Sequence, residues 1–141
     1  MKKAMYSVSL VLMVLLCVLN LAACKQAATD VWKDAIYTED TELGEGATTL
    51  VVEVKAEDKM VTFTIHTDKD VVGDALLEHG LIAGDKDEYG LYVKTVNGIL
   101  ADYDVDRTYW GFYIDGEYAM TGVDATEITE GTTYGLTLTK G

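Results

Sequence analysis

The sequence predicts an α+β fold, in which a mixed β-sheet packs against one helix. Two alternating apolar and polar runs lie close together near residue 50, one helical pattern follows them, and further strand patterns fill the rest of the chain. The chain has no proline, so no residue within the predicted strands breaks them.

Residues 48–56 and 60–66 predict an antiparallel hairpin. Apolar side chains occupy every second position, from Leu50 to Val54 in the first run and from Val61 to Ile65 in the second. The polar residues between the two runs favour a turn, so the hairpin has one buried face.

A change of period predicts a helix over residues 71–79. Its buried face consists of residues at helical spacing, namely Val72, Ala75, Leu76 and His79. Thr67 and Asp70 have the spacing of a capping box, and Gly80 is suited to end the helix. Gly73 lowers helix propensity by about 1 kcal/mol relative to alanine, so packing has to stabilise this helix.

Strand patterns return after a polar loop at residues 83–88. We expect strands over residues 91–96, 109–114, 117–120 and 133–139. Asp115-Gly116 is a strong hairpin-turn signal between the second and third of them. In the second, Trp110 and Phe112 share the face expected to join the core. The order of hairpin, helix and further strands is that of a ubiquitin-like β-grasp roll.

The N-terminus predicts export and lipid attachment. Residues 1–23 combine Lys2 and Lys3 with an apolar stretch and a closing Leu-Ala-Ala, as in a secretory signal. The Cys24 that follows resembles the lipobox cysteine of bacterial lipoproteins, which is lipidated before cleavage. We therefore expect a signal peptide over 1–23, a lipidated acidic tether over 24–47 that docks at most one strand or turn, and a folded domain over 48–141.

Composition excludes several functions. The formal net charge of −13 becomes −15 without Lys2 and Lys3, and such a surface repels nucleic acid and anionic lipids. Both serines and Cys17 belong to the predicted signal, so serine and cysteine acyl-transfer chemistry is excluded from the mature domain. Zinc sites rich in Cys and His are excluded too, since only His66 and His79 are available. We expect a protein that is not an enzyme, with a carboxylate-dependent hydrolase as the weaker alternative.

Several motifs share a pattern with a known family. These are Gly90 to Val96 with Asn97-Gly98, Arg107 to Trp110, Asp115-Gly116 and Gly131. The pattern resembles the C-terminal β-domain of transcobalamin and intrinsic factor, which a bacterial family of unknown function shares. The resemblance covers roughly residues 48–140, and implies a binding module with a corrinoid as ligand. Because the chain lacks the helical domain of those carriers, such a role implies a partner protein or a second copy.

Two candidate sites follow from the residues. Tyr109, Tyr113 and Tyr118 form an expected aromatic platform beside a glycine, suited to stacking a flat ligand or a glycan. Packing by loops is the alternative.

The second candidate site is acidic. Asp102, Asp104 and Asp106 alternate like the start of a calcium loop, and predict a looser site for Ca²⁺ or another divalent cation. A solvated acidic loop is the alternative.

The expected function is that of a lipoprotein on the outer face of the bacterial cell membrane. It binds a small molecule, a corrinoid or a divalent metal, and presents it to a transporter. The alternative is a cell-surface module that adheres to a protein or glycan and has no cofactor.

Overall fold

Two sheets and several short helices make up the structure, a computed structural model that describes residues 30–141. The elements in chain order are η1 (Val31–Asp34), β1 (Thr41–Leu43), β2 (Thr48–Ala56), β3 (Lys59–Thr67), α2 (Val72–Glu78), β4 (Ile82–Asp87), β5 (Gly90–Val96), β6 (Ile99–Leu100), α3 (Tyr103–Asp106), β7 (Thr108–Ile114), β8 (Glu117–Tyr118), η2 (Val123–Ala125) and β9 (Thr133–Lys140). The expected signal peptide and Cys24 lie outside the described residues. Among those residues, no helix is both long and apolar enough to span a bilayer.

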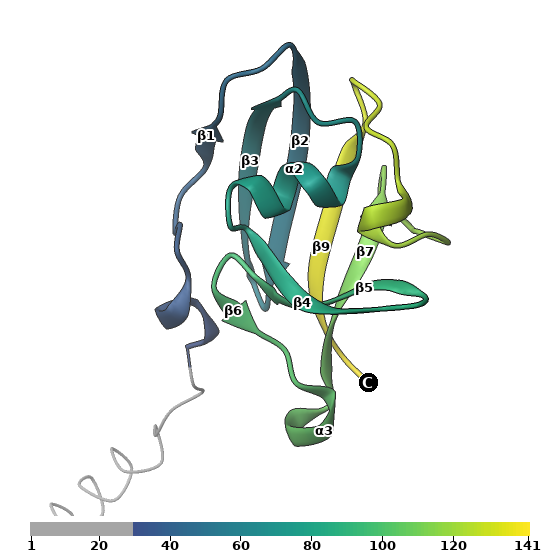
Figure 1. The fold of residues 1–141 in the computed structure, drawn as a ribbon. Coiled ribbons are helices and arrows are strands. Elements are labelled where there is room, and N and C mark those ends of the chain that lie inside the picture. Colours follow the sequence, from purple (N-terminus) through teal and green to yellow (C-terminus); the bar gives the residue numbers. More distant parts are fainter. Residues whose placement is uncertain (1–29) are drawn as a thin grey trace, which may run out of the picture. The chain divides into compact units, whose positions relative to one another are not determined.

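The larger sheet has six strands in the order β1-β3-β2-β9-β7-β8. The hairpin β2–β3 is antiparallel, as predicted, and β9 pairs in parallel with β2 and antiparallel with β7. Helix α2 crosses in front of this sheet (Figure 1). The α+β prediction is therefore confirmed at the level of fold class.

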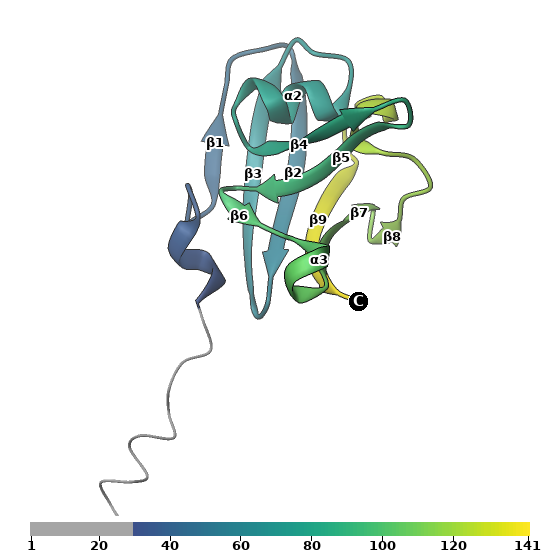
Figure 2. The same cartoon turned by 60° about the horizontal axis from the view of Figure 1, so that its bottom comes forward.

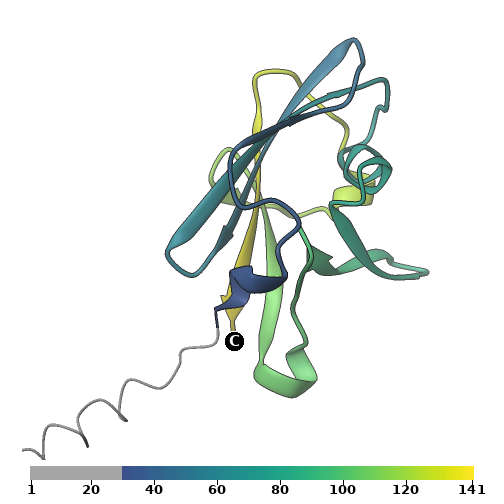
Figure 3. The ribbon, with the colours of Figure 1, turned by 90° about the vertical axis from the view of Figure 1, so that its left-hand side faces the viewer.

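A second sheet of three strands, β4-β5-β6, lies on the same side of the large sheet as α2 (Figures 2 and 3). The prediction of a loop over residues 83–88 is wrong, because β4 pairs with β5 from Ile82 to Asp87. The side chains of β4 after Ile82 are exposed, so the strand has no apolar alternation to detect. Backbone pairing to β5 holds it in place.

Helix α2 does not begin with the predicted capping box. Its N-cap is Val71, which has extended backbone and no side-chain cap. A β-bridge between Val71 and Glu127 holds the chain extended there, and the Val72 N–H donates to the Thr126 carbonyl. Thr67 instead accepts a hydrogen bond from the Lys69 N–H. A long-range contact therefore starts the helix.

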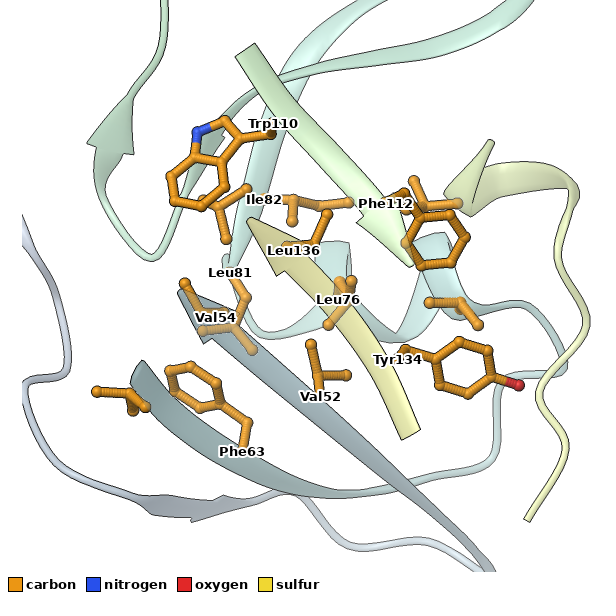
Figure 4. Close-up of a cluster of buried hydrophobic side chains, with 14 of the residues drawn as sticks. Val52, Val54, Phe63, Leu76, Leu81, Ile82, Trp110, Phe112, Tyr134 and Leu136 are labelled. Atoms are coloured by element: carbon orange, nitrogen blue, oxygen red, sulfur yellow. The ribbon is translucent and has the colours of Figure 1, made fainter. Parts of the chain in front are cut away.

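The core lies between the larger sheet, α2 and the smaller sheet (Figure 4). Trp110, Phe112 and Leu136 point into it, which confirms the predicted core face of the 109–114 strand. The Trp110 indole donates a hydrogen bond of 3.1 Å to the Ile99 carbonyl, joining the two sheets. The Phe112 ring stacks on Tyr134, with ring centroids 6.2 Å apart.

The segment before β2 is packed onto the body. The compact unit begins at Val31, earlier than the expected boundary at residue 48, and β1 pairs in parallel with β3. The Trp32 side chain is buried, and its indole donates to the Ala56 carbonyl at 2.9 Å. The part of the expected tether that the structure describes from Val31 onward thus belongs to the folded unit.

Asn97 clamps this segment from the β5–β6 turn. It is fully buried and has a φ of 51°; its Nδ2 donates to the Tyr37 carbonyl at 2.8 Å, and its Oδ1 accepts from the Tyr37 N–H at 2.9 Å. The following Gly98 also has a positive φ, as a tight Asn-Gly turn requires.

We expect Asn97→Ala to lower the free energy of unfolding by about 2–4 kcal/mol. The variant loses two buried hydrogen bonds and places an alanine in left-handed backbone. Glu57→Ala is the matched control, since Glu57 has a similar φ of 55° and is exposed, and should cost less than about 1 kcal/mol. Urea unfolding measures both, and equal effects of the two variants would contradict the clamp.

Candidate functional site

A groove of about 420 Å³ lies between β5 and β7, and we call it the edge groove. Its walls come from β5, from β7 and from the segment after β8. The lining residues are Leu91, Tyr92, Val93, Tyr109, Trp110, Phe112, Leu136 and residues 118–123. None of them carries a formal charge.

Consecutive residues line the groove on both strands. Neighbouring side chains of a strand point to opposite faces, so a cavity lined by Tyr109 and Trp110 runs along the edge of β7 and not over one face. The same holds for Leu91 to Val93 on β5.

The edge of β7 is open along most of its length. One side of β7 pairs with β9 from Thr108 to Ile114, whereas β8 pairs on the other side only with Tyr113 and Ile114. One more hydrogen bond, from the Ala119 N–H to the Phe112 carbonyl, follows before the chain turns away. In the described part of the chain, residues 108–111 have no strand neighbour on the groove side.

The groove has an apolar floor and an exposed rim. Trp110, Phe112 and Leu136 in its floor are also part of the core (Figure 4). On the rim, the Met120 side chain is 96% exposed and Tyr118 is 62% exposed. A solvent-facing methionine beside aromatic rings is typical of an adaptable binding surface.

Asp124 fixes the end of the groove near η2. Its Oδ2 accepts a hydrogen bond of 3.0 Å from the Leu91 N–H and so ties β5 to η2. A Cβ at Gly90 would lie 2.9 Å from this carboxylate, and a Cβ at Gly73 would lie 3.0 Å from the Asp124 backbone. Both glycines therefore let α2, β5 and η2 pack closely.

The predicted tyrosine platform is divided between two surfaces. Tyr113 and Tyr118 lie opposite each other in β7 and β8, with an edge-to-face ring contact of 5.5 Å between centroids. Tyr109 and Tyr118 line the edge groove, but Tyr113 lines a separate hollow on the outer face of the sheet, away from α2. Sequence alternation found the shared face of Tyr109 and Tyr113, yet gave no signal for Met120 or for residues 91–93.

The expected alternating acidic loop is a turn of helix. Asp102 is the N-cap of α3, and its Oδ1 accepts from the Asp104 N–H at 3.1 Å. Asp106 accepts hydrogen bonds from the Thr108 hydroxyl and N–H, which hold the pKa of Asp106 below its usual range. Within residues 30–141, no three His, Cys, Asp or Glu side chains are grouped as metal ligands.

Asp102 and Asp104 instead line an acidic groove of about 400 Å³ between α3 and the β4–β5 hairpin, together with Asp85 and Asp87. The Lys94 ammonium lies in this groove, 2.6 Å from the Asp85 carboxylate. That hydrogen bond and the nearby negative charge raise the pKa of Lys94. Lys94 therefore pairs with one of the four carboxylates that line this groove.

Comparison with known proteins identifies the family of this chain. The sequence pattern of the family described as Domain of unknown function (DUF4430) matches residues 69–140. No match was found among curated proteins. The chain belongs to the DUF4430 family, and the expectation of a domain-of-unknown-function family is confirmed.

Solved structures similar to this chain include the following two. A protein from Ruminococcus gnavus, described as a candidate metal-binding protein, is 31% identical, with a TM-score of 0.63; the match covers 67% of this chain and 99% of that one. Haptocorrin in complex with Cbi, of the transcobalamin family, is 17% identical, with a TM-score of 0.48, and the match covers 70% of this chain and 27% of haptocorrin.

Replacing the Thr108 hydroxyl should raise the pKa of Asp106 toward its ordinary value. A carboxyl with a lowered pKa stabilises the folded state above its unfolded pKa, and this contribution is lost as the pH falls through the folded pKa. Thr108→Val should therefore be less stable than the wild type at neutral pH, and this difference should shrink in strong acid.

Carbon-13 carboxyl NMR measures the pKa of Asp106, and urea unfolding at neutral pH and in strong acid measures stability. The control is Thr64→Val. Thr64 lies in β3 and its side chain has no hydrogen bond within the described structure. An unchanged pKa in Thr108→Val would contradict the assigned cause.

Proposed function

We propose that this protein is a non-catalytic binding protein that holds its ligand in the edge groove. The observation that carries this proposal is the groove itself, with its apolar floor, exposed rim and open strand edge. Ligand sites are typically concave and mostly apolar, with a few polar groups that orient the ligand. Here the open backbone of β7, the Tyr92 and Tyr118 hydroxyls and Thr121 supply those polar groups.

The composition of the groove supports binding over catalysis. General acid–base chemistry needs a titratable group placed against the reacting atoms, and no His, Asp, Glu or Lys lines the groove. Two acids adjoin lining residues in sequence: Asp124 accepts a hydrogen bond from the Leu91 N–H, and Glu117 does not line the groove.

The first ligand to test is a corrinoid, which the resemblance of roughly residues 48–140 to the transcobalamin domain implies. A groove open along one side suits a ligand that a second protein covers on its other face. A divalent metal in the acidic groove is the second candidate, favoured by the description of the Ruminococcus gnavus relative. The Lys94 ammonium beside Asp85 weighs against it, because it lowers the net negative charge of the groove.

Titration of the full-length chain with cobinamide and with cyanocobalamin tests the first ligand. We expect a saturable absorbance change that Met120→Ala weakens roughly fivefold to tenfold, since an exposed methionine contributes contact area to a ligand and nothing to the core. Leu100→Ala is the control, because Leu100 is also an exposed apolar residue but lies outside the groove. No absorbance change, or equal affinity in Met120→Ala and the wild type, would overturn the corrinoid assignment.

The change in melting temperature on adding calcium or manganese tests whether the acidic groove binds a metal. A metal in the acidic groove should raise the melting temperature of the wild type more than that of Asp104→Ala, and equal shifts in the two proteins would exclude this groove.

We further propose that the chain is lipidated at Cys24 and presents its ligand to a transporter at the outer face of the cell membrane. The pattern of residues 1–24 supports export and lipid attachment. Tethering both proteins to one membrane raises their effective concentration and so assists transfer.

Cys24→Ala should release the protein from the membrane fraction or leave its precursor uncleaved. Cys17→Ala is the control and should fractionate like the wild type, since Cys17 lies within the predicted signal. Fractionation and mass spectrometry of the natural protein give the result. Unchanged membrane association of Cys24→Ala, or a mass without acyl chains, would refute the anchor.

The detailed fold that we propose is a β-grasp roll with additions. The strand order β3-β2-β9-β7-β8, the parallel central pair and α2 across one face support it. Strand β1 at the edge and the small sheet β4-β5-β6 are the additions.

A further inference from the structure

We propose that the outer face of the large sheet carries a second binding site, which takes one pyranose ring of a neutral glycan. The site is a hollow of about 240 Å³ over β9, which we call the outer hollow. It shares no lining residue with the edge groove. Its lining residues are Glu53, Lys55, Met60, Tyr113, Gly116, Thr133, Gly135 and Thr137.

The strand register creates the outer hollow. Gly135 of β9 has two cross-strand neighbours, Tyr113 of β7 and Glu53 of β2. Because glycine has no side chain, space is left between the aromatic ring and the carboxylate. Two residues further along β9, Thr137 is the cross-strand neighbour of Lys55 on β2. The hollow is one strand wide, about 10 Å between the flanking strands, given a spacing of about 4.8 Å.

Gly135 is not required by the fold. Its φ lies outside the left-handed region, and a Cβ there would meet only the Tyr113 Cβ, at 3.4 Å, which is an ordinary contact. By contrast, a Cβ at Gly84 would overlap the Tyr92 carbonyl, and one at Gly111 would lie 3.1 Å from the Tyr113 ring. Glycine inside a strand weakens it and often marks a place where a ligand approaches the backbone. Gly135 is such a place.

Tyr113 provides the apolar side of the outer hollow. Its ring leans over Gly111, because the Cβ position there is 3.1 Å from Cε2 and 3.5 Å from the hydroxyl. Tyr118 contacts Tyr113 edge-to-face, and this contact fixes the ring. Met60, which is 49% exposed, adds apolar surface on the opposite side.

Polar groups around the outer hollow are free to bind a ligand. Within the described structure, the side chains of Glu53, Lys55 and Thr137 form no ion pair or hydrogen bond. The carboxylate accepts, the ammonium donates and the hydroxyl does both. These are the groups that pair with the hydroxyls of a sugar.

The size and chemistry of the outer hollow select a single sugar ring. Its volume is below the roughly 300–1,000 Å³ of sites for larger ligands. A pyranose has an apolar face that can stack on the Tyr113 ring. Its hydroxyls can form hydrogen bonds with Glu53 and Lys55, and the opposite charges of these two side chains cancel. A peptide strand cannot add here, because β9 is paired on both sides, and the formal net charge of −13 disfavours polyanions.

A panel of neutral oligosaccharides tests the proposal on the full-length chain. The probes are chitotetraose, cellotetraose, maltotetraose and mannotetraose, with binding followed by calorimetry and saturation-transfer NMR. We expect at least one to bind, and Gly135→Val to weaken it at least roughly tenfold, since the valine fills the hollow. Glu53→Gln, which keeps the shape, should weaken the same sugar by roughly a factor of three or more.

Controls separate binding from folding and from the edge groove. Gly135→Val should melt at the same or a higher temperature than the wild type, because a β-branched residue suits a strand. Thr139→Val, on the same strand and face but outside the hollow, and Met120→Ala, in the edge groove, should bind the sugar like the wild type. Absence of binding to every probe at high millimolar concentration would overturn the proposal. So would wild-type affinity in Gly135→Val, whatever the outcome of the corrinoid titration.

Discussion

The parallel pairing of β2 with β9 is the constraint on which the rest of the structure depends. It joins the N-terminal hairpin to the C-terminal strand in the centre of one sheet, with Val51 to Lys55 beside Thr133 to Thr137. Once β9 is central, β7 becomes its outer neighbour and the two-residue β8 leaves most of the far edge of β7 open. The same register puts Gly135 between Tyr113 and Glu53. Both proposed sites are consequences of one strand pairing.

The two sites use different chemistry on the same sheet. The edge groove offers apolar surface continuous with the core, through Trp110 and Phe112, and a stretch of unpaired backbone. The outer hollow offers hydrogen-bonding side chains over fully paired backbone. Residues 30–141 contain no serine and no cysteine, so neither proposed site has such a side chain as a nucleophile.

Local pattern predicted much of the fold, and long-range contacts account for what it missed. Alternation identified both strands of the β2–β3 hairpin and the buried face of Trp110, since burial on one face leaves a period of two. The prediction that a capping box begins α2 was wrong, because the β-bridge between Val71 and Glu127 precedes the helix instead. Strand β4 has exposed polar residues and therefore no pattern. The edge groove was not predictable, because it depends on where β8 ends relative to β5.

Methyl NMR of the methionines tests the central claim, that the edge groove binds the ligand, most directly. Met60 lines the outer hollow and Met120 the edge groove, so their methyl signals, assigned with leucine variants, report the two sites separately. On titration with cobinamide, the account predicts a saturable shift of the Met120 methyl and no shift of the Met60 methyl. An unmoved Met120 signal alongside cobinamide binding seen by absorbance would contradict it.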